Sequence, residues 1–396
     1  MKYNKKFLLA SFLIPLALAA CKDNKTTQIT LTVANPTETA FGPRTVEIPA
    51  NSVLPRLGGE GFVVIDPSGN EIPSQLTYDS LIIFTANVAP GESKNYTIHA
   101  TDSMLSYPAT VWGDFYPQRR DDVAYENELV GFRLYGPGTQ NAGERSYGFD
   151  LFLKHPTDNL VVPDLYAEQC SEENWKKVDS LRKIKQKLAD EFIDSFTYHI
   201  DHGKGMDCYA VGSTLGAGAP ALLENGSMAF PWCYEKAEIL DNGPLRFTLA
   251  MQFAPKEVGT AKNVTEHRII SLDSRQHLNK TKVWYEGLDG DKTVVTGFPL
   301  RDESEVIPDA EAGIVAYADP TQGPNNGRAL VGVVLAQSPD SIMFSEGHVL
   351  MARQLSPADT LSYQWGFAWD RTDITSLRDW KAYLDNAGLR YTVTVE

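Results

Sequence analysis

The stretch that decides the fold is the C-terminal segment 243–396, which opens with GPLRFTLAMQFAP at residues 243–255. Apolar and polar side chains alternate in this opening, and similar short segments follow, each bounded by a turn. Such a period of two is typical of half-buried β-strands. The pattern predicts a short helix at 376–387 and strands at Leu245–Phe253, Glu266–Leu272, Lys280–Tyr285, Thr293–Gly297, Gly313–Ala318, Ala329–Leu335, Ser362–Trp369 and Arg390–Val395.

Residues 28–102 repeat this organisation on a smaller scale, with short alternating segments separated by turn signals such as PSGN at 67–70. One helical pattern interrupts the strands at 171–196, where apolar residues recur at steps of three and four. We therefore predict a mainly β fold: a small N-terminal β-sandwich at 28–102, then a large antiparallel β-sandwich at 103–396 that carries the catalytic site and one long inserted helix.

The N-terminus has the features of an export signal. Three lysines precede an apolar run from Phe7 to Ala17, and the sequence LAAC follows at 18–21. We expect residues 1–20 to be removed and Cys21 to carry a lipid. The expected location is therefore the cell envelope, at the outer membrane, with the lipid anchor as the chain's contact with the membrane. A periplasmic orientation is favoured over the cell surface.

Charge and motifs exclude several classes of function. The chain has 51 acidic against 36 basic residues, a net charge of −15, which disfavours nucleic acid as a partner. Any anionic substrate must then be held by local arginine and lysine. The sequence contains no G-x-S-x-G elbow, Walker loop or G-x-G-x-x-G opening a helix, so acyl transfer by a nucleophile elbow, nucleotide hydrolysis and Rossmann-type cofactor binding are improbable.

The densest polar chemistry lies at 198–212, in YHIDHGKGMDCYAVG. If residues 198–202 form a strand, Tyr198 and His202 share one face, and His199 lies on the other. A metal site that uses both histidines is then disfavoured, and no metal or other cofactor is expected. Tyr198 and His202 form the better acid–base pair, with His199 as a further catalytic candidate, and Lys204 adds a cation for substrate.

A second polar cluster is RRDD at 119–122. Arginine grips a carboxylate in two places, so Arg119 and Arg120 are candidates for binding a sugar acid. We add Asp122 and the nearby Tyr125 to this candidate subsite. In an extended chain Arg119 would share one face with Asp121, and Arg120 would share the other with Asp122. The alternative interpretation is a cluster of ion pairs on the protein surface.

Both clusters also carry a resemblance. The blocks RRDD with YEN at 125–127, FRLYGP at 132–137, the stretch 198–212 and the sequence LGAG at 215–218 resemble a family of exported Bacteroidota proteins encoded in polysaccharide-utilisation loci. That family was long filed as of unknown function and includes a dehydratase of ulvan oligosaccharides. The resemblance covers nearly the whole mature chain, and it provides no catalytic assignment that maps onto single residues.

The resemblance implies removal of water across C4–C5 of a glucuronic or iduronic acid at the non-reducing end of an oligosaccharide linked to sulfated rhamnose. The product would be a 4,5-unsaturated uronate, the substrate of a glucuronyl hydrolase. The site composition fits, since an arginine can neutralise the carboxylate while a base and an acid move protons. A polysaccharide lyase, a sugar epimerase and a non-catalytic glycan-binding lipoprotein remain as alternatives.

Overall fold

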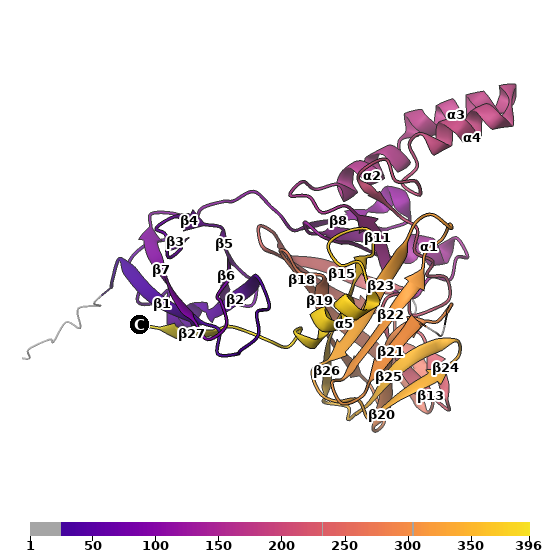
Figure 1. Ribbon diagram of the computed structural model, residues 1–396. Helices are drawn as coiled ribbons and strands as arrows, with labels where there is room; N and C mark the ends of the chain where they lie inside the picture. The colour runs from indigo at the N-terminus through magenta and orange to yellow at the C-terminus, as the bar shows by residue number, and fades with distance from the viewer. Residues whose placement is uncertain (1–24, 232, 303–304) are drawn as a thin grey trace, which may run out of the picture.

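The computed structural model describes residues 25–231, 233–302 and 305–396, so the predicted signal peptide and the lipidation of Cys21 lie outside the described residues. The chain forms a small N-terminal lobe and a larger body (Figure 1). All strand pairs between named strands are antiparallel in the described part of the chain, which confirms the expected mainly β fold.

The small lobe is a sandwich of two sheets. One sheet has the order β27-β1-β7-β3-β4 and the other β2-β6-β5. The strands are β1 (Gln28–Ala34), β2 (Arg44–Pro49), β3 (Gly61–Ile65), β4 (Glu71–Ile72), β5 (Ser74–Leu76), β6 (Leu81–Ala86), β7 (Ser93–Thr101) and β27 (Thr392–Val395), with a 3-10 turn at Ala50–Ser52. Ile29, Leu31 and Val33 of β1 alternate into its core, as the period of two predicts.

The last strand corrects the predicted domain boundary. β27 pairs with β1, from Leu31 with Val395 to Ala34 with Thr392, so the C-terminus completes the small sandwich instead of the large one. The pairing has a physical reason, because it covers the edge of β1 that would otherwise expose free backbone donors and acceptors. Val393 and Val395 also pack against the core of the small lobe.

A five-stranded sheet of order β12-β11-β10-β9-β8 opens the larger body. Its strands are β8 (Trp112–Tyr116), β9 (Asp122–Glu126), β10 (Gly131–Leu134), β11 (Asp150–Lys154) and β12 (Gly205–Met206). A 3-10 turn, Pro117–Arg119, connects β8 to β9, and the helix α1 (Pro137–Asn141) follows β10. Every residue of β9, β10 and β11 is buried, so this sheet is covered on both faces.

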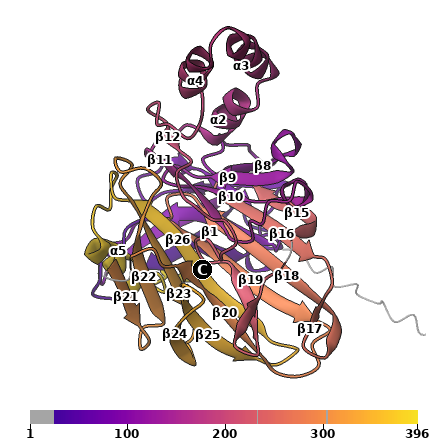
Figure 2. The same ribbon diagram turned by 90° about the vertical axis from the view of Figure 1, so that its right-hand side faces the viewer.

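Two further sheets complete the body (Figure 2). The nine-stranded sheet has the order β15-β16-β18-β19-β26-β23-β22-β21, with β17 beside β18, and the other has the order β14-β13-β20-β25-β24. The strands are β13 (Pro220–Glu224), β14 (Ser227–Ala229), β15 (Tyr234–Asn242), β16 (Arg246–Phe253), β17 (Lys256–Val258), β18 (Ala261–Asp273), β19 (Leu278–Glu286), β20 (Lys292–Pro299), β21 (Val306–Asp309), β22 (Ile314–Pro320), β23 (Arg328–Leu335), β24 (Ser341–Ser345), β25 (His348–Leu355) and β26 (Thr360–Trp369).

These sheets enclose one large core. Trp365, Phe367 and Trp369 of β26 are all buried in this core. The helix α5 (Leu377–Asp385), predicted at 376–387, packs on the outer side of β22 and β23 through Trp380 and Leu384.

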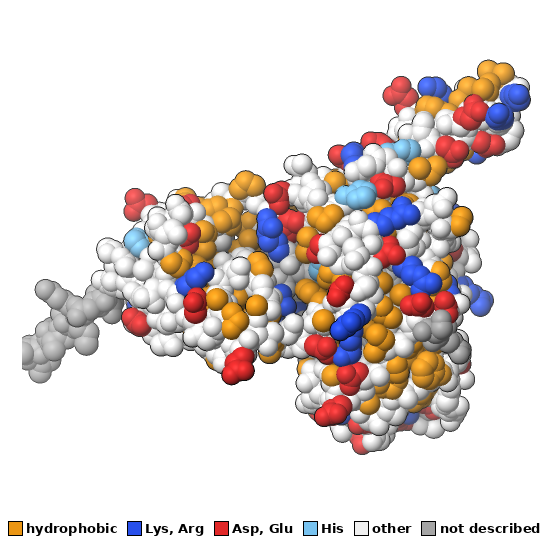
Figure 3. Space-filling model, viewed as in Figure 1, with side chains coloured by type: hydrophobic (Ala, Val, Ile, Leu, Met, Phe, Trp, Pro, Cys, Tyr) orange, Lys and Arg blue, Asp and Glu red, His pale blue; other side chains and the backbone are white. Residues whose placement is uncertain are grey.

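The helical region expected at 171–196 is present, with a break at Lys185. The helix α2 (Val162–Gln169) leads into α3 (Glu172–Ile184), and α4 (Gln186–Asp194) returns beside it. Lys185 has extended dihedrals (φ −164°, ψ 127°), so the chain reverses there. Figure 1 shows this hairpin projecting from the body, and Figure 3 shows acidic and basic side chains interspersed on it.

Folding back explains the apolar stripe of the hairpin. Val178 of α3, Ala189 of α4 and Phe196 form a small buried cluster of their own, which a single straight helix would leave in water. Among the described residues, no helix is long and apolar enough to cross a membrane.

Candidate active site

The segment 198–202, expected as a strand, is a loop that follows α4. Its turn is held by Asp201, whose carboxylate accepts hydrogen bonds from the backbone N–H of Gly203 (2.8 Å) and Gly205 (3.0 Å). Gly205 has φ +114°, and a Cβ there would meet the Leu153 carbonyl oxygen at 2.2 Å, so only glycine fits against β11. The predicted alternation of side chains along 198–202 is therefore wrong.

The loop separates the two histidines in a different way. His199 lies against Asp207, and its Nδ1 is 2.9 Å from the Asp207 carbonyl oxygen and 3.6 Å from Asp207 Oδ2. A carbonyl oxygen only accepts, so Nδ1 carries the proton and the neutral ring keeps a free lone pair on Nε2. His202 is exposed at the tip of the loop and makes no hydrogen bond or ion pair within the described part of the chain.

The cluster at 119–122 also departs from an extended chain. Arg119 ends a 3-10 turn, and both Arg120 (φ +57°) and Asp121 (φ +62°) adopt left-handed dihedrals before β9 begins at Asp122. The predicted pairing of faces is wrong as a result: Arg119 and Asp122 turn inward, whereas Arg120 is exposed and pairs with Glu144 at 2.7 Å.

A buried arginine forms the centre of the site. Arg133 of β10 is 4% exposed and forms ion pairs with Asp150 of β11 and with Asp207 (2.8 Å). Its Nη2 also donates to the Tyr135 hydroxyl at 3.0 Å. Two carboxylates and a phenol therefore surround one guanidinium, the arrangement that a buried charge requires.

Tyr198 links this centre to Arg119. Its hydroxyl oxygen accepts hydrogen bonds from Arg119 Nε (3.1 Å) and Arg133 Nη1 (3.2 Å). Tyr198 is 1% exposed and lies beneath Arg119, away from solvent. This geometry makes Tyr198 a positioning residue for the two arginines instead of a group that touches substrate.

An open pocket of about 510 Å³ lies over this centre. Arg119, Arg133, Tyr135, Glu144, Arg145, Ser146, His199, Asp207, Tyr209, Ala210, Val211, Gly212, Ser213 and Gln322 line it. Two of its cations have donors to spare: Arg119 Nη1 is buried without a hydrogen-bond partner in the described structure, and the exposed Arg145 side chain has no ion-pair partner there. The pocket suits a carboxylate-bearing ligand of monosaccharide size or larger.

Burial shifts the acid–base groups around the pocket. It raises the pKa of Asp122 to about 7, against the opposing effect of Arg133 and Arg119, and that of Asp150 to about 6. Burial also raises the pKa of Tyr135 well above its ordinary value. Tyr135, which donates its hydroxyl hydrogen to Asp150, therefore stays protonated at neutral pH.

Three other predicted substrate contacts do not line the pocket. Tyr125 is fully buried in the core, stacked on Phe247, with its hydroxyl hydrogen-bonded to Asn279 at 3.0 Å. Lys204 pairs with Asp164 (3.0 Å) and Glu168 (3.7 Å) of α2. Asp122 is fully buried beneath the pocket, where it accepts a hydrogen bond from Tyr166.

The described residues contain no group of three or more histidine, cysteine or acidic side chains placed to hold a metal ion. Cys170, Cys208 and Cys233 are free thiols in this structure. Asp201 pairs with the ring of His155, whose Nε2 lies 2.8 Å from the Asp201 carboxylate.

Sequence reasoning missed the central group. Arg133 and Asp150 lie in short strands in which most other residues are apolar. Their charge was the signal that could have identified the centre, because a charged residue inside a buried strand is rare unless it is paired. A second such pair, Glu126 and Lys154, joins β9 to β11, and Glu126 also accepts the N–H of Val162 at the start of α2. Arg145 and Tyr209 carried no comparable signal.

These features define a mainly β, antiparallel protein with an arginine–carboxylate centre beneath an open polar pocket. The chain belongs to the family described as "Domain of unknown function (DUF4861)", whose model matches residues 33–395. It is 23% identical to the "Uncharacterized protein P7" of Formosa agariphila, over 96% of this chain and 95% of that protein.

Two solved structures from Enterococcus faecalis are similar in fold. A protein of glycosyl hydrolase family 38 matches with a TM-score of 0.51 and an α-mannosidase with 0.49, each at 8% identity over 94% of this chain. The chain spans about half the length of these structures, 48% and 46% respectively. At this identity the likeness concerns the fold alone.

Proposed function

We propose that this protein is a hydro-lyase that removes water across C4–C5 of a uronic acid at the non-reducing end of ulvan-derived oligosaccharides. The product is a 4,5-unsaturated uronyl end, which a downstream glucuronyl hydrolase consumes. The observation that carries the proposal is the ring of His199, held by the Asp207 carbonyl with Nε2 free, in a pocket that also offers the cations Arg119 and Arg145. The resemblance of the sequence to exported proteins of polysaccharide-utilisation loci supplies the substrate class.

The elimination assigns one task to each group. Arg119 and Arg145 bind the substrate carboxylate and stabilise the negative charge that develops when the C5 proton leaves. His199 Nε2 takes that proton, and the electron pair of the C5–H bond forms the C4–C5 double bond. The C4 hydroxyl departs with a proton from Tyr135, which makes water. No redox change occurs, so the reaction requires no redox cofactor.

The test is incubation of the protein with saturated uronyl–rhamnose-3-sulfate oligosaccharides, followed by mass spectrometry and ultraviolet absorbance. The proposal predicts loss of one water and rising absorbance of the unsaturated uronate, with no new reducing ends. New reducing ends with the same absorbance would identify a polysaccharide lyase. Exchange of the C5 hydrogen with solvent without loss of water would identify an epimerase, and binding without conversion would leave a glycan-binding lipoprotein.

The proposed location is the cell envelope, by a lipid on Cys21. Its support is the lipobox LAAC at 18–21 alone. Metabolic labelling with a radioactive fatty acid should mark the wild-type chain and not the Cys21→Ala variant, and surface proteolysis of intact cells then distinguishes the periplasmic face from the cell surface. Equal labelling of both chains would contradict the anchor.

A further inference from the structure

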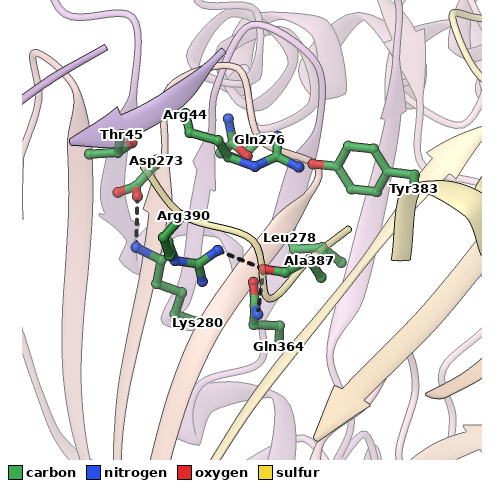
Figure 4. A pocket seen from close by; sticks show the side chains of 10 residues that line it. All are labelled: Arg44, Thr45, Asp273, Gln276, Leu278, Lys280, Gln364, Tyr383, Ala387 and Arg390. Atoms are coloured by element: carbon green, nitrogen blue, oxygen red, sulfur yellow. Dashed lines mark hydrogen bonds and ion pairs between the residues drawn. The ribbon is translucent and has the colours of Figure 1, made fainter. Parts of the chain in front are cut away.

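A second polar cavity lies at the junction of the small lobe with the nine-stranded sheet. Its lining residues differ from those of the candidate active site. It comprises two adjoining pockets, a smaller one of about 20 Å³ and a larger one of about 370 Å³, which share Lys280, Gln364 and Arg390 in their walls. Figure 4 shows the smaller pocket, whose lining also includes Arg44 and Gln276. None of its lining residues belongs to the pocket over Arg133.

Arg44, the first residue of β2, carries a buried charge that lacks an acid. It is 7% exposed, and its guanidinium packs on the rings of Phe41 (5.7 Å) and Tyr383 (5.5 Å). Its hydrogen bond is to the neighbouring Pro43 carbonyl at 3.3 Å, and no acidic side chain of the described residues pairs with it. A buried cation without a counter-charge is costly, so this position favours an anion.

Arg390, which is exposed to solvent, provides a second cation without an ion pair in the lining of the cavity. Its Nη1 donates to the carbonyl oxygens of Ala387 (2.6 Å) and Leu389 (2.8 Å), and within the described chain it forms no ion pair. Burial lowers the pKa of Arg390, which shows that its surroundings do not compensate the charge fully.

Two acids of the cavity, Asp273 and Glu47, are already engaged, while Asp79, which forms no ion pair among the described residues, lines the larger pocket together with the cation Lys282. Asp273 pairs with Arg246 and with Lys280 (3.1 Å), and Glu47 pairs with the same two cations, at 2.9 Å from Lys280. Two acids are thus shared by two cations, and Arg44 and Arg390 remain as excess positive charge. Two guanidinium groups without ion pairs in the lining of one cavity are an arrangement in which an oxyanion is bound.

We propose that this cavity is an anion-binding site for a sulfate or carboxylate group, with Arg44 and Arg390 as its principal ligands. The oxyanion binds beside Arg390, which both pockets share, and the larger pocket, which contains Tyr78 and Tyr363, has room for a sugar that carries it. The site recognises a negatively charged ligand on a protein whose overall charge repels anions, so the two arginines act locally. This inference is independent of the proposed elimination, because it concerns binding at a different place.

The test is calorimetry of the wild-type protein with inorganic sulfate and with rhamnose 3-sulfate, at constant ionic strength set by sodium chloride. Arg390→Gln removes the exposed ligand, and we expect the dissociation constant to rise about tenfold or more, as the loss of one charge-assisted hydrogen bond implies. Arg44→Gln should have an equal or larger effect. Arg353→Gln, which alters an arginine paired with Asp340 elsewhere, is the matched control and should bind as the wild type does.

The two ligands identify the source of the anion. Tighter binding of the sulfated sugar than of sulfate would show that the larger pocket binds the saccharide. Equal binding of the two ligands would show that the site recognises the free anion. Absence of binding by both ligands, or equal affinity in the wild type and Arg390→Gln, would overturn the proposal. Because Arg390 is exposed, its variant is expected to fold even if loss of the buried Arg44 destabilises the chain.

Discussion

Arg119 and Arg133 meet at the single hydroxyl oxygen of Tyr198, and this shared acceptor sets the position of Arg119 in the pocket. The phenol occupies Arg119 Nε and leaves Nη1 free of protein partners among the described residues. A guanidinium fixed in this way is pre-organised for a carboxylate, because little rotamer entropy is lost when the ligand binds.

The neighbouring arginines provide a matched pair of variants. Arg119→Gln should lower kcat/KM on the uronyl oligosaccharide by about 10- to 100-fold, the equivalent of one charge-assisted hydrogen bond. Arg120→Gln should remain near wild type, because Arg120 faces outward to Glu144. Steady-state absorbance kinetics measure both. A loss in Arg120→Gln as large as in Arg119→Gln would contradict the assignment.

Asp122 predicts a pH dependence of stability. Its pKa is about 7 in the folded protein, above the value of about 3.9 in an unfolded chain. The folded state therefore holds the proton more tightly, and the free energy of unfolding falls as pH rises from about 4 to about 7. Asp122→Asn should flatten this slope in urea titrations. Asp194→Asn, an exposed control at the end of α4, should keep it, and a slope unchanged in Asp122→Asn would contradict the shift.

At the scale of single residues, the sequence predicted which residue types form the site better than it predicted where their side chains point. Arg119 and His199 were identified from residue type and do line the pocket. Tyr125 was misplaced because β9 is buried on both faces, which puts its ring in the core. His202 was misplaced because its direction was inferred from extended backbone, whereas it is exposed at a loop tip. Two left-handed residues and a glycine turn broke that alternation.

The hairpin of α3 and α4 should unfold independently of the rest of the protein. Its cluster around Val178 is separate from the main core, so Val178→Asp, which buries a charge, should unfold the hairpin backbone, speed tryptic cleavage after its lysines and leave the global unfolding midpoint nearly unchanged. Ile184→Asp is the control, because Ile184 is already 75% exposed and should tolerate the charge. Loss of the whole fold in Val178→Asp would contradict this independence.

β27 should stabilise the small lobe from the other end of the chain. A chain that ends at Tyr391 loses the pairing with β1 and the packing of two partly buried valines, so its free energy of unfolding should fall by about 2 kcal/mol. Urea unfolding followed by the fluorescence of the lobe's tyrosines measures the change. Unaltered stability would show that the edge of β1 needs no cover.

The sequence predicted these elements to different degrees. The alternating strands and the helix at 376–387 were recognisable because local pattern determines them. The break at Lys185 was not, since lysine is a good helix former and the chain reverses there to bury an apolar stripe. The partner of β27 depends on contacts between residues more than 300 positions apart, which no local pattern reports.

The whole molecule contains two polar cavities, which differ in how far acidic side chains compensate the charge of their arginines. In the pocket over Arg133 the carboxylates of Asp150 and Asp207 compensate the charge of the buried arginine. In the cavity at the junction of the lobes Arg44 and Arg390 form no ion pair among the described residues, which favours an anion. The proposed elimination and the proposed anion binding therefore occupy separate sites.

The most direct test of the central claim compares two histidine variants in the elimination assay. Dehydration of the uronyl oligosaccharide should fall about 100-fold or more in His199→Ala, because the base that takes the C5 proton is lost. His202→Ala should stay within a few-fold of the wild type, since that ring is exposed and outside the pocket. Full activity in His199→Ala, or loss of activity in His202→Ala alone, would contradict the account.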